Sequence, residues 1–211
     1  MGVLSDVRAL THSVHQSLDD HPLLVQFMSQ AKVSAYQNFL QTFSLYLRLV
    51  TAKEHEFITT GDQNVLRYEP WSIALKSDLE AYPKGDDFNF AERFSTLLPD
   101  IENLSEFWGL LYVLEGSSLG GKQVAGTLSD AWPSQFLSRG HHSRLRWPYF
   151  CRRLGELETA GAIESSGVQR GAMKAFVSML SIFDGCLERS ASRNREFITL
   201  SSEMQAADDM G

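Results

Sequence analysis

The chain has 211 residues, of which 43% are hydrophobic and 21% are charged, a composition typical of a folded domain rather than of a disordered segment. Its formal net charge of −7 at pH 7 disfavours sequence-independent binding to nucleic acids and a general affinity for anionic membranes. Only two cysteines are present, Cys151 and Cys186, and no Cys/His cluster accompanies them. They therefore predict neither a zinc site nor a disulfide framework, and they fit a reducing, cytoplasmic location.

Hydrophobic residues recur at helical spacing along almost the whole chain, and no segment shows the sustained alternation of a strand. No stretch approaches the roughly 20 apolar residues that a membrane span needs. Proline and capping residues predict helices at 5–19, 23–31, 34 to about 58, 71–82, 91–98, 105 through the glycines that follow, 147–160 and 167–189, with Ser5, Ser34 and Ser105 as caps. We therefore predict an all-α, single-domain multi-helix bundle over residues 1–190, followed by a polar C-terminal tail at 191–211.

The segment "YVLEGSSLGG", which begins at Tyr112, places three glycines inside one predicted helix. An interior glycine costs roughly 1 kcal/mol relative to alanine, so bare backbone must be needed there. At 100° per residue, one stripe about 80° wide contains Gly109, Tyr112, Gly116 and Gly120. Gly121 lies off this stripe, and we interpret it as a loosening of the helix that permits a kink.

The glycine stripe has two interpretations. Small residues allow two helices to pack closely, and they equally allow a flat ligand to lie against the backbone. Ser117 and Ser118 stand between the glycines, and buried serines need carbonyl, water or ligand partners. Glu115, in the same apolar helix, is interpreted as half of a structural ion pair with a neighbouring helix rather than as a catalytic group.

The first predicted helix carries two polar residues on one side, Arg8 and His15. They are seven residues apart, which places them within about 20° of each other and roughly 10 Å apart along the axis. A neutral imidazole and a guanidinium so placed suit haem, whose iron takes an axial imidazole and whose propionates take a cation. The alternative is that His15 is an ordinary half-buried, hydrogen-bonded histidine. His12 is expected at the surface.

Two segments together resemble the haem oxygenase family. "RALTHSVHQSLDDHPLL" is similar to the start of the family's first helix, and Thr11 and His15 match its Thr-x-x-x-His spacing. "YVLEGSSLGGK" resembles the distal helix, in the form found in the bacterial branch beside bacteriophytochromes. In many members an aspartate follows the first distal glycine, whereas this chain has Ser117 at that place.

The resemblance implies a haem held between the first helix and a kinked distal helix, with His15 as the iron ligand and Arg8 at a propionate. It implies a second propionate-binding cation, for which Arg152 and Arg153 are the candidates. The implied haem-binding residues are Arg8, Thr11, His15, Tyr112, Gly116, Ser117, Gly120, Gly121, Arg152 and Arg153, of which Gly116, Ser117 and Gly120 are the implied catalytic positions.

The implied activity is the cleavage of haem to biliverdin, carbon monoxide and ferrous iron, with dioxygen and external electrons. The implied partners are haem, a ferredoxin or flavodoxin with its reductase, and a bacteriophytochrome that receives the biliverdin. Either a docking site for an acidic electron donor, a propionate site or an ordinary solvated face would explain the basic residues Arg139, Arg144, Arg146, Arg152 and Arg153. Two other functions remain open: a non-catalytic haem store or sensor, and a helical interaction module without a cofactor.

Overall fold

The computed structural model describes residues 2–82, 89–126, 128, 132–138 and 145–208, apart from the side chains of 122, 123, 190 and 193–208. The helices are α1 (Val3–Asp19), α2 (Pro22–Met28), α3 (Val33–Phe57), α4 (Thr60–Gln63), α5 (Glu69–Glu80), α6 (Phe90–Phe94), the 3₁₀ turn η1 (Ser95–Leu97), α7 (Leu104–Ala125), α8 (Gln135–Ser138), α9 (Arg146–Thr159) and α10 (Ser165–Asp208). In these described ranges no strand occurs, which confirms the prediction of an all-helical chain. None of the helices so described combines the length and the apolar character needed to cross a membrane.

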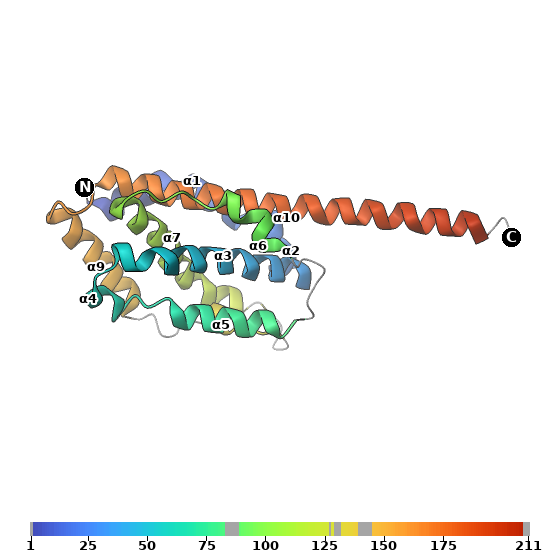
Figure 1. The fold of residues 1–211 in the computed structure, drawn as a ribbon, viewed down its shortest axis with the longest axis horizontal. Coiled ribbons are helices and arrows are strands. Elements are labelled where there is room, and N and C mark those ends of the chain that lie inside the picture. The colour runs from blue at the N-terminus through green and yellow to red at the C-terminus, as the bar shows by residue number, and fades with distance from the viewer. Residues whose placement is uncertain (1, 83–88, 127, 129–131, 139–144, 209–211) are drawn as a thin grey trace.

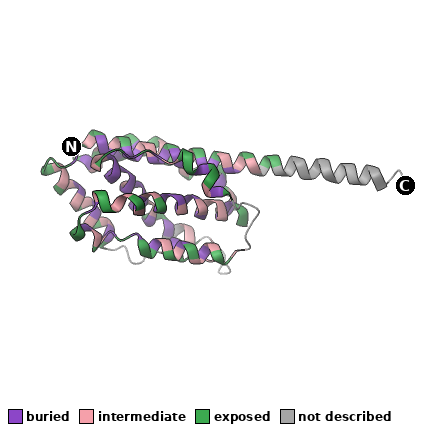
Figure 2. Cartoon of the chain, viewed as in Figure 1, coloured by how far each residue is buried: buried purple, intermediate pink, exposed green. Residues whose placement is uncertain are grey.

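The helices form one bundle in which α1 and α7 both pack along α10 (Figure 1). Helix α3 lies between α10 and α5 and contacts both, and α2 joins α3 to the end of α1 (Figure 1). The last helix does not end at residue 189 as predicted but continues to Asp208, so that most of the predicted tail is helical and extends beyond the bundle (Figure 1). Buried and exposed residues alternate along the helices, as the helical period requires (Figure 2).

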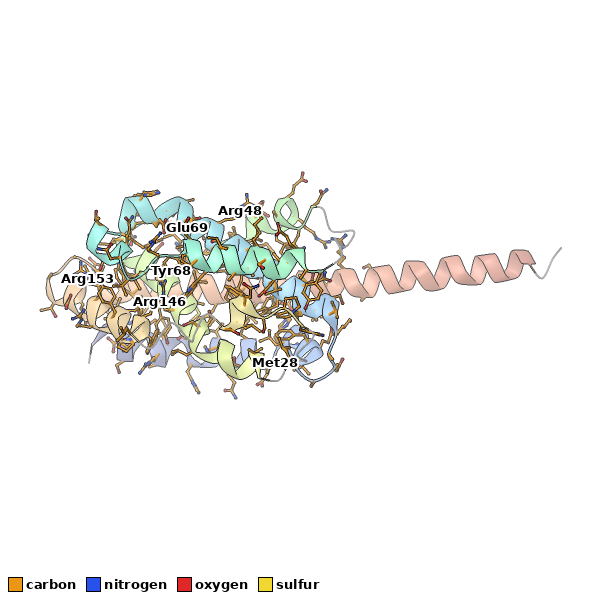
Figure 3. All side chains as sticks on the ribbon, turned by 90° about the horizontal axis from the view of Figure 1, so that it is seen from below. Met28, Arg48, Tyr68, Glu69, Arg146 and Arg153 are labelled. Carbon is orange, nitrogen blue, oxygen red and sulfur yellow. The ribbon has the colours of Figure 1, made fainter. Side chains whose placement is uncertain are left out.

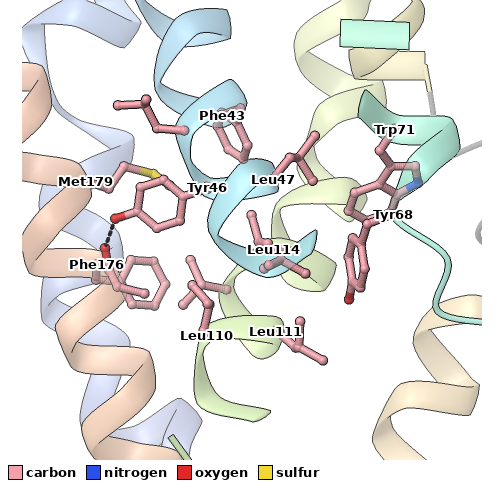
Figure 4. Close-up of a cluster of buried hydrophobic side chains, with 14 of the residues drawn as sticks. Phe43, Tyr46, Leu47, Tyr68, Trp71, Leu110, Leu111, Leu114, Phe176 and Met179 are labelled. Atoms are coloured by element: carbon pink, nitrogen blue, oxygen red, sulfur yellow. Dashed lines mark hydrogen bonds between the residues drawn. The ribbon is translucent and has the colours of Figure 1, made fainter. Parts of the chain in front are cut away.

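The interior of the bundle lies between α3, α7 and α10. Tyr46 of α3 is fully buried and donates its hydroxyl hydrogen to the carbonyl oxygen of Ala175 at 2.7 Å. Leu110 and Leu114 of α7 and Phe176 of α10 pack around it (Figure 4). Burial raises the pKa of the Tyr46 phenol well above its usual range, so it serves as a neutral hydrogen-bond donor.

The three serines predicted as helix caps, Ser5, Ser34 and Ser105, do not cap their helices, and Ser34 lies inside α3, which begins at Val33. The first helix begins at Val3 rather than after Ser5, and the Val3 amide donates to both carboxylate oxygens of Glu158 on α9, at 3.0 and 3.1 Å. A carboxylate at a helix N-terminus satisfies free amides and opposes the helix dipole. In α7 it is Asn103, not Ser105, whose side chain accepts from the Glu106 amide, at 3.0 Å.

The contact between α7 and α10 depends on two glycines facing each other's backbone. A Cβ atom on Gly109 would overlap the carbonyl oxygen of Val168, and one on Gly171 would overlap the carbonyl oxygen of Glu106. No side chain fits at either position. This part of the glycine stripe is therefore a helix-packing seam, which holds α7 against α10 and sets the position of the rest of α7.

Candidate functional site

A cavity of about 600 Å³ lies beside α7, between α1, α3 and α10. Its volume is within the range of roughly 300–1,000 Å³ that small-molecule sites occupy. The lining residues are Arg8, His15, Leu18 and Asp19 of α1, Leu24 and Met28 of α2, Phe39 and Phe43 of α3, Tyr112, Val113, Gly116, Ser117, Leu119, Gly120, Gly121 and Val124 of α7, Leu137 of α8, Trp147 of α9, and Phe176, Met179 and Phe183 of α10. Most are apolar, so the cavity suits a ligand with a large apolar body and few polar groups.

His15 reaches this cavity from α1 with its ring oriented by a carboxylate. The Nδ1 atom is 2.9 Å from Oδ2 of Asp19, one helical turn further on, and the ring lies edge-on to Phe176 at 5.5 Å between centroids. A carboxylate beside Nδ1 favours the tautomer that carries its proton there, which leaves the Nε2 lone pair available. More than half of the His15 side-chain surface is exposed, at 56%, so the imidazole is accessible to a ligand.

Arg8 also lines the cavity, in agreement with the prediction that Arg8 and His15 lie on the same side of the first helix. Its guanidinium carbon lies 5.9 Å from the centroid of the Trp147 ring. Within the described part of the chain, no carboxylate lies at salt-bridge distance from Arg8. The guanidinium is exposed and is thus accessible to an anionic group of a ligand.

Thr11 does not line the cavity, although the resemblance implies it as a haem contact. It is buried on the core side of α1 with Val7, and its hydroxyl donates to the Val7 carbonyl oxygen at 2.8 Å. A hydroxyl that is satisfied inside its own helix has a structural role. His12 is exposed, as expected, and is absent from the cavity wall.

On the α7 wall the glycine stripe divides into two parts. A Cβ atom on Gly116 or on Gly120 would meet no heavy atom of another residue within 4 Å, and both glycines line the cavity. This is the opposite of Gly109 on the same stripe, which is covered by α10. Gly121 differs from both, because α8 covers it: a Cβ atom there would lie 2.8 Å from the carbonyl oxygen of Leu137. The bare backbone at Gly116 and Gly120 thus faces open space.

The polar groups on the α7 wall are few. Tyr112 lines the cavity beside Trp147, with 6.1 Å between the ring centroids. Ser117 also lines it, and its hydroxyl donates to the Leu114 carbonyl oxygen at 2.7 Å. Ser118 is buried and donates to the Glu115 carbonyl oxygen at 2.6 Å. Of the two serines, only Ser117 lines the cavity.

Glu115 forms the structural ion pair that the sequence predicted. Its carboxylate is fully buried and lies 2.7 Å from Nη2 of Arg146, at the start of α9. The Tyr68 hydroxyl donates to the same carboxylate at 2.6 Å, and Figure 3 shows Tyr68 and Arg146 close together. Burial and the adjoining carboxylate raise the pKa of Tyr68 well above its usual range, so Tyr68 remains a donor. This cluster joins α7 to α9 directly beside Gly116 and Trp147.

The structure does not bring Arg152 or Arg153 to the cavity. Arg153 binds Asp62, with 2.8 Å from Nε to Oδ1, and the Arg152 guanidinium lies over the Tyr149 ring at 5.3 Å. Although burial alone would raise the pKa of Asp62, hydrogen bonds from Thr59, Arg153 and Tyr149 lower it, which fits a structural ion pair. The side of α9 that carries Arg153 faces α4 instead of the cavity.

Two of the basic residues for which a donor-docking site, a propionate site or a solvated face was considered are engaged in ion pairs. Arg146 is buried against Glu115, and Arg153 is paired with Asp62. Arg139 and Arg144 lie outside the described residues.

Two residues of the cavity wall, Asp19 and Trp147, were not predicted from the sequence. A carboxylate four residues after His15 was a usable signal, but nothing local marks Trp147, which reaches the cavity only through the packing of α9.

Comparison of the chain with models of protein families, with curated proteins and with solved structures finds no match. The chemistry of the cavity must therefore be inferred from its own residues. Among the described residues they are one imidazole with the Asp19 carboxylate that orients it, one guanidinium, the hydroxyls of Tyr112 and Ser117, two uncovered glycines and an otherwise largely apolar wall.

Proposed function

We propose that the chain is a haem oxygenase, which cleaves haem to biliverdin, carbon monoxide and ferrous iron with dioxygen and electrons from a separate donor. The observation that carries this proposal is that His15 of α1 and the uncovered backbone at Gly116 and Gly120 of α7 line one cavity. Both sequence segments that resemble the family thus contribute to the same space. A packing seam would have covered these two glycines, whereas both are open to the cavity that His15 also lines.

The residues fit haem on three points. His15 offers a nitrogen whose tautomer is set by Asp19, which is the usual arrangement for a metal-binding histidine. The aromatic and aliphatic wall, including Phe39, Phe43 and Phe183, suits an apolar macrocycle. Arg8 offers a charge for a propionate, roughly two helical turns from His15.

When bound, haem supplies the iron at which dioxygen is activated. The chain would position the haem and leave room beside its iron. His15 would hold the iron from the α1 side, and the bare backbone of Gly116 and Gly120 leaves room on the α7 side that any larger side chain would fill. The Ser117 hydroxyl can hold a water molecule and pass a proton without placing a strong acid beside the reacting atoms.

The further roles follow from the same resemblance. We infer that a ferredoxin or flavodoxin with its reductase provides the electrons, that a bacteriophytochrome takes up the biliverdin, and that the protein acts in the cytoplasm. Because Arg146 and Arg153 are engaged in ion pairs, the proposed donor site does not include them.

The decisive experiment adds hemin to the purified protein, followed by oxygen with ascorbate or a ferredoxin system, and then extracts the pigment. A Soret band and biliverdin are expected. A Soret band without pigment would support the haem store or sensor instead. No change in the hemin spectrum would overturn haem binding and leave the cofactor-free interaction module.

Arg8→Met is expected to accelerate haem dissociation by about ten- to a hundredfold, since a charge-assisted hydrogen bond contributes roughly 1.5–3 kcal/mol. Methionine keeps an unbranched apolar side chain but removes the charge. Transfer of haem to an excess of apomyoglobin measures the rate. Arg152→Met is the control, because it removes the same charge from a residue outside the cavity. Equal rates for both variants would show that Arg8 does not bind a propionate.

A further inference from the structure

Arg8 is located where two hollows meet. It lines the main cavity, and it also lines a shallower hollow of about 450 Å³ at the start of α1, together with Cys151 and Glu158. A long side chain at such a boundary has several rotamers available on either side. Something must therefore hold the guanidinium toward the main cavity if it is to meet a ligand there.

Trp147 is the neighbour of Arg8 that lines the main cavity but not the shallower hollow. The guanidinium carbon of Arg8 lies 5.9 Å from the centroid of its ring, within the roughly 6 Å at which a cation and an aromatic ring attract each other. A carboxylate in this place would neutralise the guanidinium. An aromatic ring attracts it and leaves both its charge and its N–H donors for a second partner.

The Trp147 ring is itself held in place by buried residues. It stacks on Phe150 with 5.5 Å between centroids and 21° between planes, and Phe150 stacks on Trp108 at 5.5 Å and 23°. Phe150 and Trp108 are both buried. The residue before Trp147 is Arg146, which is anchored on Glu115. The Trp147 ring is thus held by its contact with Phe150 and by the anchored residue before it, and a ring held in this way can orient the flexible side chain of Arg8.

We propose that Trp147 is a positioning residue, which holds the Arg8 guanidinium at the edge of the main cavity so that Arg8 can bind an anionic group of the ligand. The identity of that ligand as haem, and of the group as a propionate, rests on the proposed function. Trp147 acts through Arg8, and its contribution therefore exists only when both the guanidinium and the ligand carboxylate are present.

The test compares hemin with hemin dimethyl ester, which lacks the free carboxylates but keeps the iron and the macrocycle. Trp147→Leu, Trp147→Phe, Arg8→Met and the double variant Arg8→Met/Trp147→Leu are titrated with each compound. Trp147→Leu is expected to weaken hemin binding by about two- to fivefold, as expected for a cation–π contact at an exposed site, and to leave ester binding unchanged. In the Arg8→Met background the same change should have no effect on either compound.

Trp147→Phe keeps an aromatic ring and should retain most of the hemin affinity, with a smaller loss than Trp147→Leu because the ring quadrupole of phenylalanine is weaker. If Trp147→Leu does not fold, Trp147→Phe carries the same comparison between hemin and its ester. Equal losses for both compounds, an unchanged hemin affinity, or a full loss in the Arg8→Met background would each overturn the positioning role. Absence of hemin binding by the unmodified protein would overturn the proposed function instead.

Discussion

Replacing His15 with alanine is expected to lower biliverdin formation by more than about a hundredfold, because even the loss of a hydrogen-bond partner of a metal-binding histidine typically costs 10–100-fold. His15 is the imidazole of α1 that lines the cavity, and Asp19 orients its ring through Nδ1 at 2.9 Å, which leaves Nε2 for the iron. Pigment formation with ascorbate measures the rate, and the optical spectrum of the ferric complex reports the axial ligand. Added imidazole should restore part of the activity by entering the space left by the ring.

Two further variants serve as controls, one for the loss of any histidine from α1 and one for the role of Asp19 in orienting the His15 ring. His12→Ala removes an exposed histidine from the same helix and should leave the rate unchanged. Asp19→Asn keeps the size of the side chain but weakens the orientation of the ring, so an intermediate rate is expected. If His15→Ala forms biliverdin at the normal rate, His15 is not the iron ligand.

Gly120→Leu and Gly109→Ala are expected to have opposite effects, although both change a glycine on the same stripe of α7. Gly120 faces open space, so leucine fits the apo-protein, and the helix gains up to about 1 kcal/mol from its better propensity. The leucine side chain would occupy the cavity, and dioxygen binding and turnover should be lost. Alanine at Gly109 would overlap the backbone of α10, and overpacking of this kind costs about 1–3 kcal/mol, or more where backbone must move.

Thermal unfolding of the apo-proteins and the dioxygen affinity of the ferrous haem complexes separate the two effects. Gly109→Ala should unfold at a lower temperature while the remaining folded protein binds dioxygen normally. Gly120→Ala is the control for the cavity, since a single methyl group at that position meets nothing within 4 Å and should raise the unfolding temperature slightly. A Gly120→Leu protein that unfolds far below the unmodified chain, yet binds dioxygen normally, would contradict the placement of Gly120 on the cavity wall.

The sequence alone determined the longer helices of the bundle and the two faces that meet at the cavity, but it missed the short helices α4 and α8 and the continuation of α10 to Asp208. Periodic apolar residues predicted α1, α3, α7 and α9 to within a few residues of their observed ends, because the helical period is a local property that burial of one face imposes on the sequence. The same period placed Arg8 beside His15, and Gly116 beside Gly120. Both pairs line the cavity.

What covers each face was decided by the tertiary structure. Gly109 and Gly120 have the same side chain and the same direction, and they differ because α10 crosses α7 at Gly109 and leaves it before Gly120. Arg153 resembles a ligand-binding cation in the sequence, but the rotation of α9 turns it to Asp62. Trp147 enters the site from a helix that carries no recognisable motif.

The physical reason is that a helical pattern specifies the direction in which each residue points from the axis of its own helix. A binding site depends in addition on how far apart the helix axes lie and how the helices are rotated, which tertiary packing sets. Ser5 and Ser105 have the chemistry of helix caps, yet other residues perform that role. The packing of α9 brings Glu158 to the start of α1, and Asn103, which directly precedes α7, accepts from the Glu106 amide. The sequence therefore determines which residues can face a ligand, and the packing of α1, α7, α9 and α10 determines which of them do.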